Sequence, residues 1–170
     1  ALGTPVRMED AEQRVFGICL LNDWSARDHQ FWEMTPLGPF LGKNFLTSIS
    51  PWIVTAEALV PFRKAPWRPE GKSDVLPYLD SRTNRTHGAF DIRLEAGLRT
   101  ASMPVTEVAW LSQSNHADAY WTVAQMIAHH AVNGCDLHAG DLLGTGTQSS
   151  PGPRGEGCMV EFAAGGRSPV

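Results

Sequence analysis

The sequence predicts an α+β fold in which strands dominate and helices are few. Several short apolar runs have strand length, and only one segment has a convincing helical pattern. Glycine, proline and tryptophan are frequent, at 16, 12 and 6 of 170 residues, which is typical of a loop-rich chain. The chain is 42% hydrophobic and shows neither repeat nor linker. Residues 1–170 are therefore expected to be part of a single domain.

The first half combines strands with one short helix. After a polar, turn-rich start, residues 15–21 join β-branched, aromatic and aliphatic side chains, which predicts a buried strand. A short helix is expected at 25–32 with Ser25 as its N-cap. It must end before 36–42, because proline and glycine disfavour a continuing helix. A second strand is expected at 50–55.

The second half begins with a long loop at 61–88, rich in proline, arginine and aspartate. Residues 90–98 alternate apolar and charged side chains, which predicts a half-solvated antiparallel strand. The broad apolar face of 117–132 predicts the one clear helix, closed by Gly134. Two more strands are expected from short apolar runs at 141–143 and 158–162.

Composition excludes several classes of function. The formal net charge is -4, with 14 basic and 18 acidic residues and no basic run, so a nucleic-acid partner is not expected. No apolar run approaches the roughly 18 residues of a membrane span, and no signal sequence is evident. The three cysteines are widely spaced and suggest neither a disulfide framework nor a zinc site. The expected compartment is therefore the cytoplasm.

Residues able to do chemistry gather directly after the first predicted strand. Asp23, Arg27, Gln30 and Lys43 bring together a carboxylate, a guanidinium, an amide and an ammonium. The carboxylate can hold a hard divalent cation, and the donors can stabilise a developing oxyanion. Arg27 and Gln30 share a face if their segment is helical. Such a set is typical of metal-assisted hydrolysis.

Each of these residues also has a purely structural interpretation. Asp23 can cap the next turn or form an ion pair with Arg27. Gln30 can be an ordinary surface side chain. Lys43 can be solvated, although its apolar neighbours suggest that the ammonium emerges from an apolar wall. Thr47 can add a hydroxyl to the site or simply favour a strand.

The C-terminal part offers weaker signals. Glu161 lies in the last predicted strand, where alternation favours a side chain that faces solvent. The small-residue loop at 144–147 can bring backbone amides close to an anion or can be a hairpin turn. The histidines do not combine with Cys135 into a zinc site, because no second pair of ligands exists.

Two stretches together resemble the fumarylacetoacetase family: FGICLLNDWSARD at 16–28 and PLGPFLGKNF at 36–45. Further similarity covers nearly the whole chain, at 50–54, 77–79, 120–122, 129–130, 133–147 and the segment around Glu161. The resemblance implies a mixed β-roll with few helices that works as a homodimer. It also implies a small diketo-acid substrate: fumarylacetoacetate is hydrolysed at a C–C bond to fumarate and acetoacetate, in the last step of tyrosine breakdown.

The resemblance also implies roles for individual residues. Asp23 corresponds to a carboxylate that binds Ca²⁺ or Mg²⁺, and Lys43 and Thr47 correspond to residues near that metal. Arg27, Gln30 and Lys43 correspond to the group that stabilises the carbanion or oxyanion. These assignments come from the family and not from spacing.

Substrate contacts are implied for Gln30, for the position of Met34 and for Thr147, while Glu161 corresponds to the acid that orients a catalytic histidine. Met34 stands where the family usually has a tyrosine. The general-base histidine and the other metal carboxylates are expected upstream of Ala1. The chain is thus expected to be the C-terminal part of a catalytic domain that lacks its base when alone.

Two alternatives remain open on the sequence. One is another enzyme of the same superfamily, such as an acylpyruvate hydrolase or an oxaloacetate-type decarboxylase. The other is a non-catalytic remnant or a dimerisation scaffold.

Overall fold

The computed structural model of the protein describes residues 2–71 and 75–168. Its helices and strands are short and are mixed along the chain, which confirms the predicted α+β class. The chain forms two compact units: a larger unit of residues 1–15 and 59–170, and the 16–58 unit, Phe16–Ala58. No helix in the described part of the chain has the length and apolar character needed to cross a bilayer.

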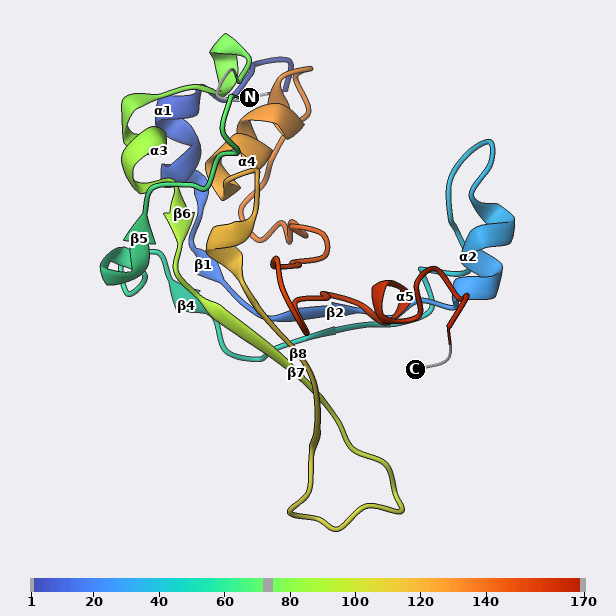
Figure 1. The fold of residues 1–170 in the computed structure, drawn as a ribbon. Helices are drawn as coiled ribbons and strands as arrows, with labels where there is room; N and C mark the ends of the chain where they lie inside the picture. The colour runs from blue at the N-terminus through green and yellow to red at the C-terminus, as the bar shows by residue number, and fades with distance from the viewer. Residues whose placement is uncertain (1, 72–74, 169–170) are drawn as a thin grey trace. The chain divides into compact units, whose positions relative to one another are not determined.

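The core of the larger unit forms where helix α4 (Val123–Ala131) packs against helix α1 (Met8–Ala11) and the 3-10 turn η3 (Pro77–Leu79) (Figure 1). Apolar side chains recur along α4 at helical spacing, so they share the face that turns to this core. The buried members of the cluster are Met8, Ala11, Leu79, Ala124, Ile127 and Ala128.

Helix α4 begins later than the sequence pattern predicts. Thr122 accepts a hydrogen bond from the Gln125 amide (3.2 Å), and the Gln125 side chain accepts one from the Thr122 amide (3.1 Å). This reciprocal capping box fixes the start of the helix. The residues before it form the 3-10 turn η4 (His116–Asp118). The expected end is confirmed, since Gly134 has φ of 85°, a conformation that glycine adopts readily.

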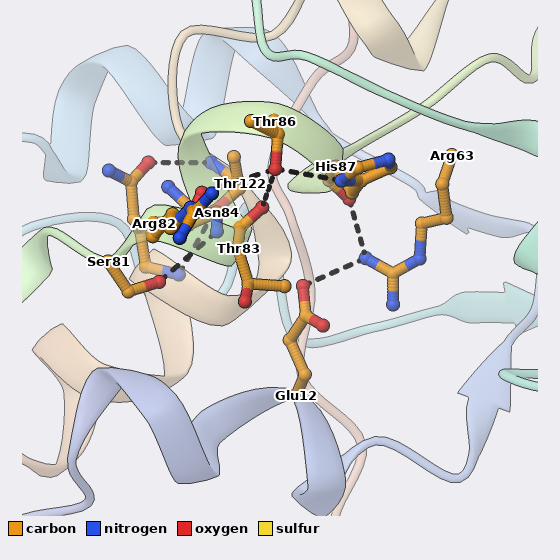
Figure 2. A network of polar contacts seen from close by, with 10 residues as sticks. Glu12, Arg63, Ser81, Arg82, Thr83, Asn84, Thr86, His87 and Thr122 are labelled. Atoms are coloured by element: carbon orange, nitrogen blue, oxygen red, sulfur yellow. Dashed lines mark hydrogen bonds and ion pairs between the residues drawn. The ribbon is translucent and has the colours of Figure 1, made fainter.

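A buried polar network joins α4 to helix α3 (Arg82–His87). The Thr122 hydroxyl donates to Asn84 Oδ1 at 2.7 Å, and the Asn84 amide donates to the Ser81 hydroxyl at 3.1 Å, which caps α3 (Figure 2). Thr122 and Asn84 are almost fully buried. Polar groups buried this deeply are costly when they lack partners, so the pairing stabilises the unit.

Arg63 connects several short elements of the larger unit. Its Nη1 lies 2.9 Å from Glu12 Oε1 and donates to the His87 carbonyl at 3.2 Å (Figure 2). Its guanidinium also lies 4.1 Å from the centre of the Phe90 ring. Such a guanidinium combines an ion pair with a cation–π contact. Arg63 thereby connects η1 (Glu12–Arg14), helix α3 and the paired strands β5 (Arg63–Lys64) and β6 (Ala89–Phe90), and the 3-10 turn η2 (Val60–Phe62) directly precedes β5.

The longest strands are β7 (Arg93–Leu98) and β8 (Ala109–Asn115), which pair antiparallel and continue into the long connecting loop in Figure 1. The strand predicted at 90–98 is therefore divided. Its first residue belongs to β6, which pairs with β5, and residues 93–98 pair with β8. The alternating pattern identified the strand but not the change of partner at 91–92.

The 16–58 unit contains two antiparallel strand pairs and one helix. The strand predicted at 15–21 divides into two short strands and is not buried, since Phe16 is 74% and Leu20 is 65% exposed. The expected N-cap is also wrong: the cap position is Ala26 and has no side-chain hydrogen bond. The elements are β1 (Gly17–Ile18) paired with β4 (Val54–Thr55), β2 (Leu21–Asp23) paired with β3 (Thr47–Ile49), and helix α2 (Arg27–Glu33).

The two strands expected near the C-terminus are wrong. Residues 141–143 have no regular secondary structure, and Met159–Phe162 form the single-turn helix α5. Short apolar runs fit either a strand or a helical turn. Here the backbone finds its partners locally, because the Ala163 amide donates to the Met159 carbonyl at 3.0 Å.

Candidate functional site

The β2–β3 hairpin sets the position of Asp23. Asp23 and Thr47 are directly opposite each other in the register, and residues opposite in an antiparallel pair project to the same face. The next residues reinforce the pairing, since the Trp24 indole donates to the Ser48 hydroxyl at 3.0 Å. The carboxylate and the Thr47 hydroxyl are therefore neighbours, which the sequence spacing alone could not show.

Lys43 reaches the same carboxylate from the loop at 36–45. Its ammonium forms an ion pair with Asp23 Oδ2 and donates to the Ser25 hydroxyl at 3.0 Å. That hydroxyl donates in turn to the Asp23 carbonyl at 3.0 Å. The Lys43 and Asp23 side chains are 28% and 44% exposed, so the pair contributes little to stability. Its value is positional: it places a cationic donor beside a carboxylate.

Helix α2 carries the next two predicted residues. Arg27 Nη1 donates to Gln30 Oε1 at 2.8 Å, so the shared face expected from their spacing is confirmed. Asp23 pairs with Lys43 and not with Arg27, which replaces the ion pair considered from the sequence. With its oxygen held by Arg27, Gln30 presents its amide NH₂ as a further donor.

A close backbone contact holds the 36–45 loop against α2. The Ala26 amide donates to the Gly42 carbonyl at 2.9 Å. A Cβ on Gly42 would lie 2.6 Å from the Gln30 nitrogen and 2.9 Å from its Cα, which only glycine avoids. Gly42 is the only buried residue of the fully described 16–58 unit. The contact brings Lys43 next to the helix that carries Arg27 and Gln30.

The apolar wall expected around Lys43 is wrong within the described residues. Phe40, Leu41 and Phe45 are 66%, 60% and 56% exposed. The ammonium is therefore directed by hydrogen bonds and by its ion pair, and not by surrounding hydrocarbon.

Glu33 is a further residue of this site and is not among the residues predicted from the sequence. Its carboxylate, at the end of α2, accepts hydrogen bonds from the amides of Phe40 (2.6 Å), Leu41 (2.9 Å) and Gly42 (3.0 Å). These amides, with the Gly42 amide contributing most, hold the pKa of Glu33 below its usual value. The available signal was an acid a few residues before a glycine-flanked turn.

The oxygen donors fit a hard cation only in part. Asp23 and Thr47 offer the ligand type that Ca²⁺ and Mg²⁺ prefer, but these ions take roughly six to eight oxygens. Across residues 2–71 and 75–168, no three His, Cys, Asp or Glu side chains gather as a metal site. A lysine ammonium has no free lone pair, so Lys43 can only neighbour the ion. Asp23 and Thr47 thus fit as part of a coordination shell that other groups or water complete.

Thr147 and Glu161 belong to the larger unit and lie near each other. The Glu161 carboxylate accepts hydrogen bonds from the Ser149 hydroxyl (2.8 and 3.0 Å) and from the Gly157 amide (2.7 Å). A Cβ on Gly157 would lie 2.5 Å from the Thr147 methyl group, so Thr147 packs on the same turn. Glu161 is therefore anchored rather than loose. Met34, the C-cap residue of α2, is 44% exposed.

Comparisons with known proteins identify a family model and several relatives that match this chain. Residues 2–166 match the family model described as "Fumarylacetoacetate (FAA) hydrolase C-terminal". Proteins named fumarylacetoacetase from Arabidopsis thaliana and Homo sapiens are 47% and 45% identical over 169 residues, which is 99% of this chain. The one from Dictyostelium discoideum is 48% identical over 162 residues, or 95% of this chain.

The chain spans 38%, 39% and 36% of the lengths of these three relatives. The family match, by contrast, extends over almost all of its 170 residues. It contains the β2–β3 hairpin, helix α2 and the 36–45 loop in full. The chain therefore belongs to the fumarylacetoacetate (FAA) hydrolase C-terminal family, as its two long motifs indicated.

Proposed function

We propose that this chain is part of an enzyme that hydrolyses fumarylacetoacetate to fumarate and acetoacetate, the last step of tyrosine breakdown. One observation carries the proposal: the Lys43 ammonium is held on Asp23 and Ser25, beside the helix that bears Arg27 and Gln30. Three donors near one carboxylate suit a reaction that builds negative charge on oxygen. Proteins named fumarylacetoacetase align over 99% of this chain, at 47% and 45% identity, which supports the proposal.

The reaction places specific demands on these donors. Water adds its oxygen to the carbonyl carbon next to the bond that breaks, and a base removes the water's proton. The C–C bond then breaks, and its electron pair passes to the acetoacetate side as an enolate, which takes up a proton. Arg27, Gln30 and Lys43 donate hydrogen bonds to the oxygens that gain charge in these steps. Donors fixed in place before reaction are more effective than water, which must reorganise.

A bound Ca²⁺ or Mg²⁺ supplies Lewis-acid polarisation of a substrate oxygen. Asp23 and Thr47 are the residues of this chain that would hold it, with Lys43 beside them. The general-base histidine and the remaining ligands are assigned to other parts of the full-length protein. Glu161 is assigned to orient that histidine, which is consistent with its anchoring by Ser149.

Substrate contacts are assigned to Gln30, Met34 and Thr147. Met34 offers a thioether where the family usually offers a tyrosine hydroxyl, so it fills space but donates no hydrogen bond. Residues 1–170 are further proposed to be part of one catalytic domain of a cytoplasmic homodimer. Sedimentation analysis of the full-length protein tests the dimer, since a monomer would contradict it.

Activity assays on the full-length protein test this function. We expect loss of fumarylacetoacetate on mixing, and near-complete loss of that activity in Asp23→Ala and Lys43→Ala. Glu57→Gln is the control, because Glu57 is an exposed acid of the same unit without a hydrogen bond or ion pair among the described residues. Unchanged turnover by either site variant would contradict the assignment.

A substrate panel and a metal test separate the alternatives. Faster cleavage of an acylpyruvate, or decarboxylation of oxaloacetate, would point to another activity of the superfamily. Removal of divalent ions with a chelator should abolish turnover, and Mg²⁺ or Ca²⁺ should restore it. Absence of any turnover together with absence of Ca²⁺ or Mg²⁺ binding by calorimetry would favour a non-catalytic scaffold.

A further inference from the structure

The Glu33 carboxylate accepts hydrogen bonds from backbone amides of the loop that carries Lys43. Its Oε2 accepts from the Phe40 and Gly42 amides at 2.6 and 3.0 Å, and its Oε1 accepts from the Leu41 amide at 2.9 Å. Both oxygens are therefore engaged, and the three donors are consecutive residues. Successive amides that turn inward in this way form an anion-binding nest. The residue that follows the nest is Lys43.

Within the 16–58 unit, backbone contacts rather than buried side chains fix this loop. Leu37, Phe40 and Leu41 are 96%, 66% and 60% exposed, so burial of their side chains does not hold it. The other backbone bond between the loop and α2 joins the Ala26 amide to the Gly42 carbonyl. Glu33 thus supplies three of the four hydrogen bonds that tie residues 40–42 to α2 and its N-cap.

We propose that Glu33 is a positioning residue, which fixes the Gly42–Lys43 backbone so that the ammonium meets Asp23 and the Ser25 hydroxyl. The role depends on the proposed function for its catalytic consequence, although the contact itself does not. Glu33 donates nothing to the substrate and acts through Lys43. Its carboxylate binds three amides, so its neutral form is disfavoured and it stays ionised at neutral pH.

A carboxylate suits this task better than an amide side chain. Glutamine has the same length, but only one of its two terminal atoms accepts a hydrogen bond, and its NH₂ group would face an N–H donor. Glu33→Gln should therefore release one or two of the three amides without changing side-chain volume. Aspartate keeps the charge but is one methylene shorter, so Glu33→Asp should retain part of the contact.

The first test measures the contact without turnover, in the full-length protein. Glu33→Gln should speed amide hydrogen exchange in the peptide that contains 40–42, and should raise the rate at which formaldehyde and cyanoborohydride methylate Lys43, read by mass spectrometry. Glu57→Gln should change neither rate. If exchange and methylation stay as in the wild type, the positioning role is overturned.

The second test measures kinetics. Glu33→Gln should lower kcat for fumarylacetoacetate by roughly 10- to 100-fold, with KM changed less, because displacement of a catalytic group by about an ångström has this effect. Glu33→Asp should recover part of kcat. In a Lys43→Ala background, Glu33→Gln should add no further loss, because the group that it positions is gone. A full additional loss in that background would overturn the proposal.

The two tests also separate this role from the proposed reaction. A wild-type protein that fails to cleave fumarylacetoacetate, yet shows faster methylation of Lys43 in Glu33→Gln, would refute the reaction and support the positioning role. Normal kcat in Glu33→Gln, together with activity in the wild type, would refute the positioning role alone.

Discussion

Replacement of Gly42 by alanine tests the contact on which the candidate site depends. The added Cβ would lie 2.6 Å from the Gln30 nitrogen, 2.9 Å from its Cα and 3.2 Å from the Ala26 carbonyl oxygen. All three are backbone atoms of α2 or its cap, so no side-chain rotation relieves the clash. Overpacking of this kind costs about 1–3 kcal/mol. The lower entropy of the unfolded alanine chain offsets about 0.4–1 kcal/mol of it.

These ranges leave about 0–2.6 kcal/mol. Because the clash is with backbone atoms that cannot rotate away, we expect about 1–2 kcal/mol, which corresponds to roughly a 5- to 30-fold higher population of the open loop. Native-state hydrogen exchange of the full-length protein measures this directly, at the Ala26 and Lys43 amides that the contact orders. Amides of helix α4 should be unaffected. Because Lys43 moves with the loop, kcat/KM for fumarylacetoacetate should also fall.

Gly144→Ala is the matched control. No atom lies within 4 Å of a Cβ added at Gly144, and its backbone is not in the left-handed region. This variant should exchange like the wild type or slightly more slowly. If Gly42→Ala also kept wild-type exchange and wild-type kcat/KM, the close approach of Gly42 to α2 would not be what holds the loop.

Three further predictions concern the larger unit. Thr122→Val should lower the free energy of unfolding in urea by about 2–4 kcal/mol, because it removes a helix cap and leaves Asn84 Oδ1 without its hydrogen-bond donor. Thr122→Ser keeps the hydroxyl and should lower it by less than about 1 kcal/mol. Burial lowers the pKa of His116 below its usual 6.5, so the unfolded chain binds the extra proton. The contribution of His116 to the free energy of unfolding should therefore be constant above about pH 6.5 and should fall as the pH drops from there to the lowered pKa. This part of the pH dependence should be absent in His116→Leu, and an identical slope in that variant would refute the role of His116. Ser149→Ala should reduce kcat about fivefold by loosening Glu161, since the lost hydrogen bond contributes about 1 kcal/mol, and Ser149→Thr should restore it.

Local spacing predicted part of the site correctly. Arg27 and Gln30 are three residues apart, and this spacing alone brings their side chains together once a helix forms. Residue type and family resemblance indicate Asp23 and Lys43. Their ion pair depends on the path of the 36–45 loop, which no local pattern specifies.

Other features depend on partners distant in sequence. Thr47 faces Asp23 because of the hairpin register, and a shift by one residue would reverse its side. No sequence pattern distinguishes Glu33 from other acids, because its partners are backbone amides that every residue except proline can provide. The apolar run at 158–162 fits a strand and a helical turn equally well, and hydrogen bonds that close within one turn make it a helix.

Because Glu33 binds main-chain amides, the side chains of the loop that it holds can vary within the family. Every amino acid except proline supplies an amide hydrogen, so positions 40 and 41 can exchange one side chain for another and still be held. Mutation can thus change the side chains around Lys43, and with them the substrates that bind, while the Lys43 ammonium keeps its position. Proline at position 40 or 41 would remove one of these amide hydrogens, so it is the substitution expected to be absent there.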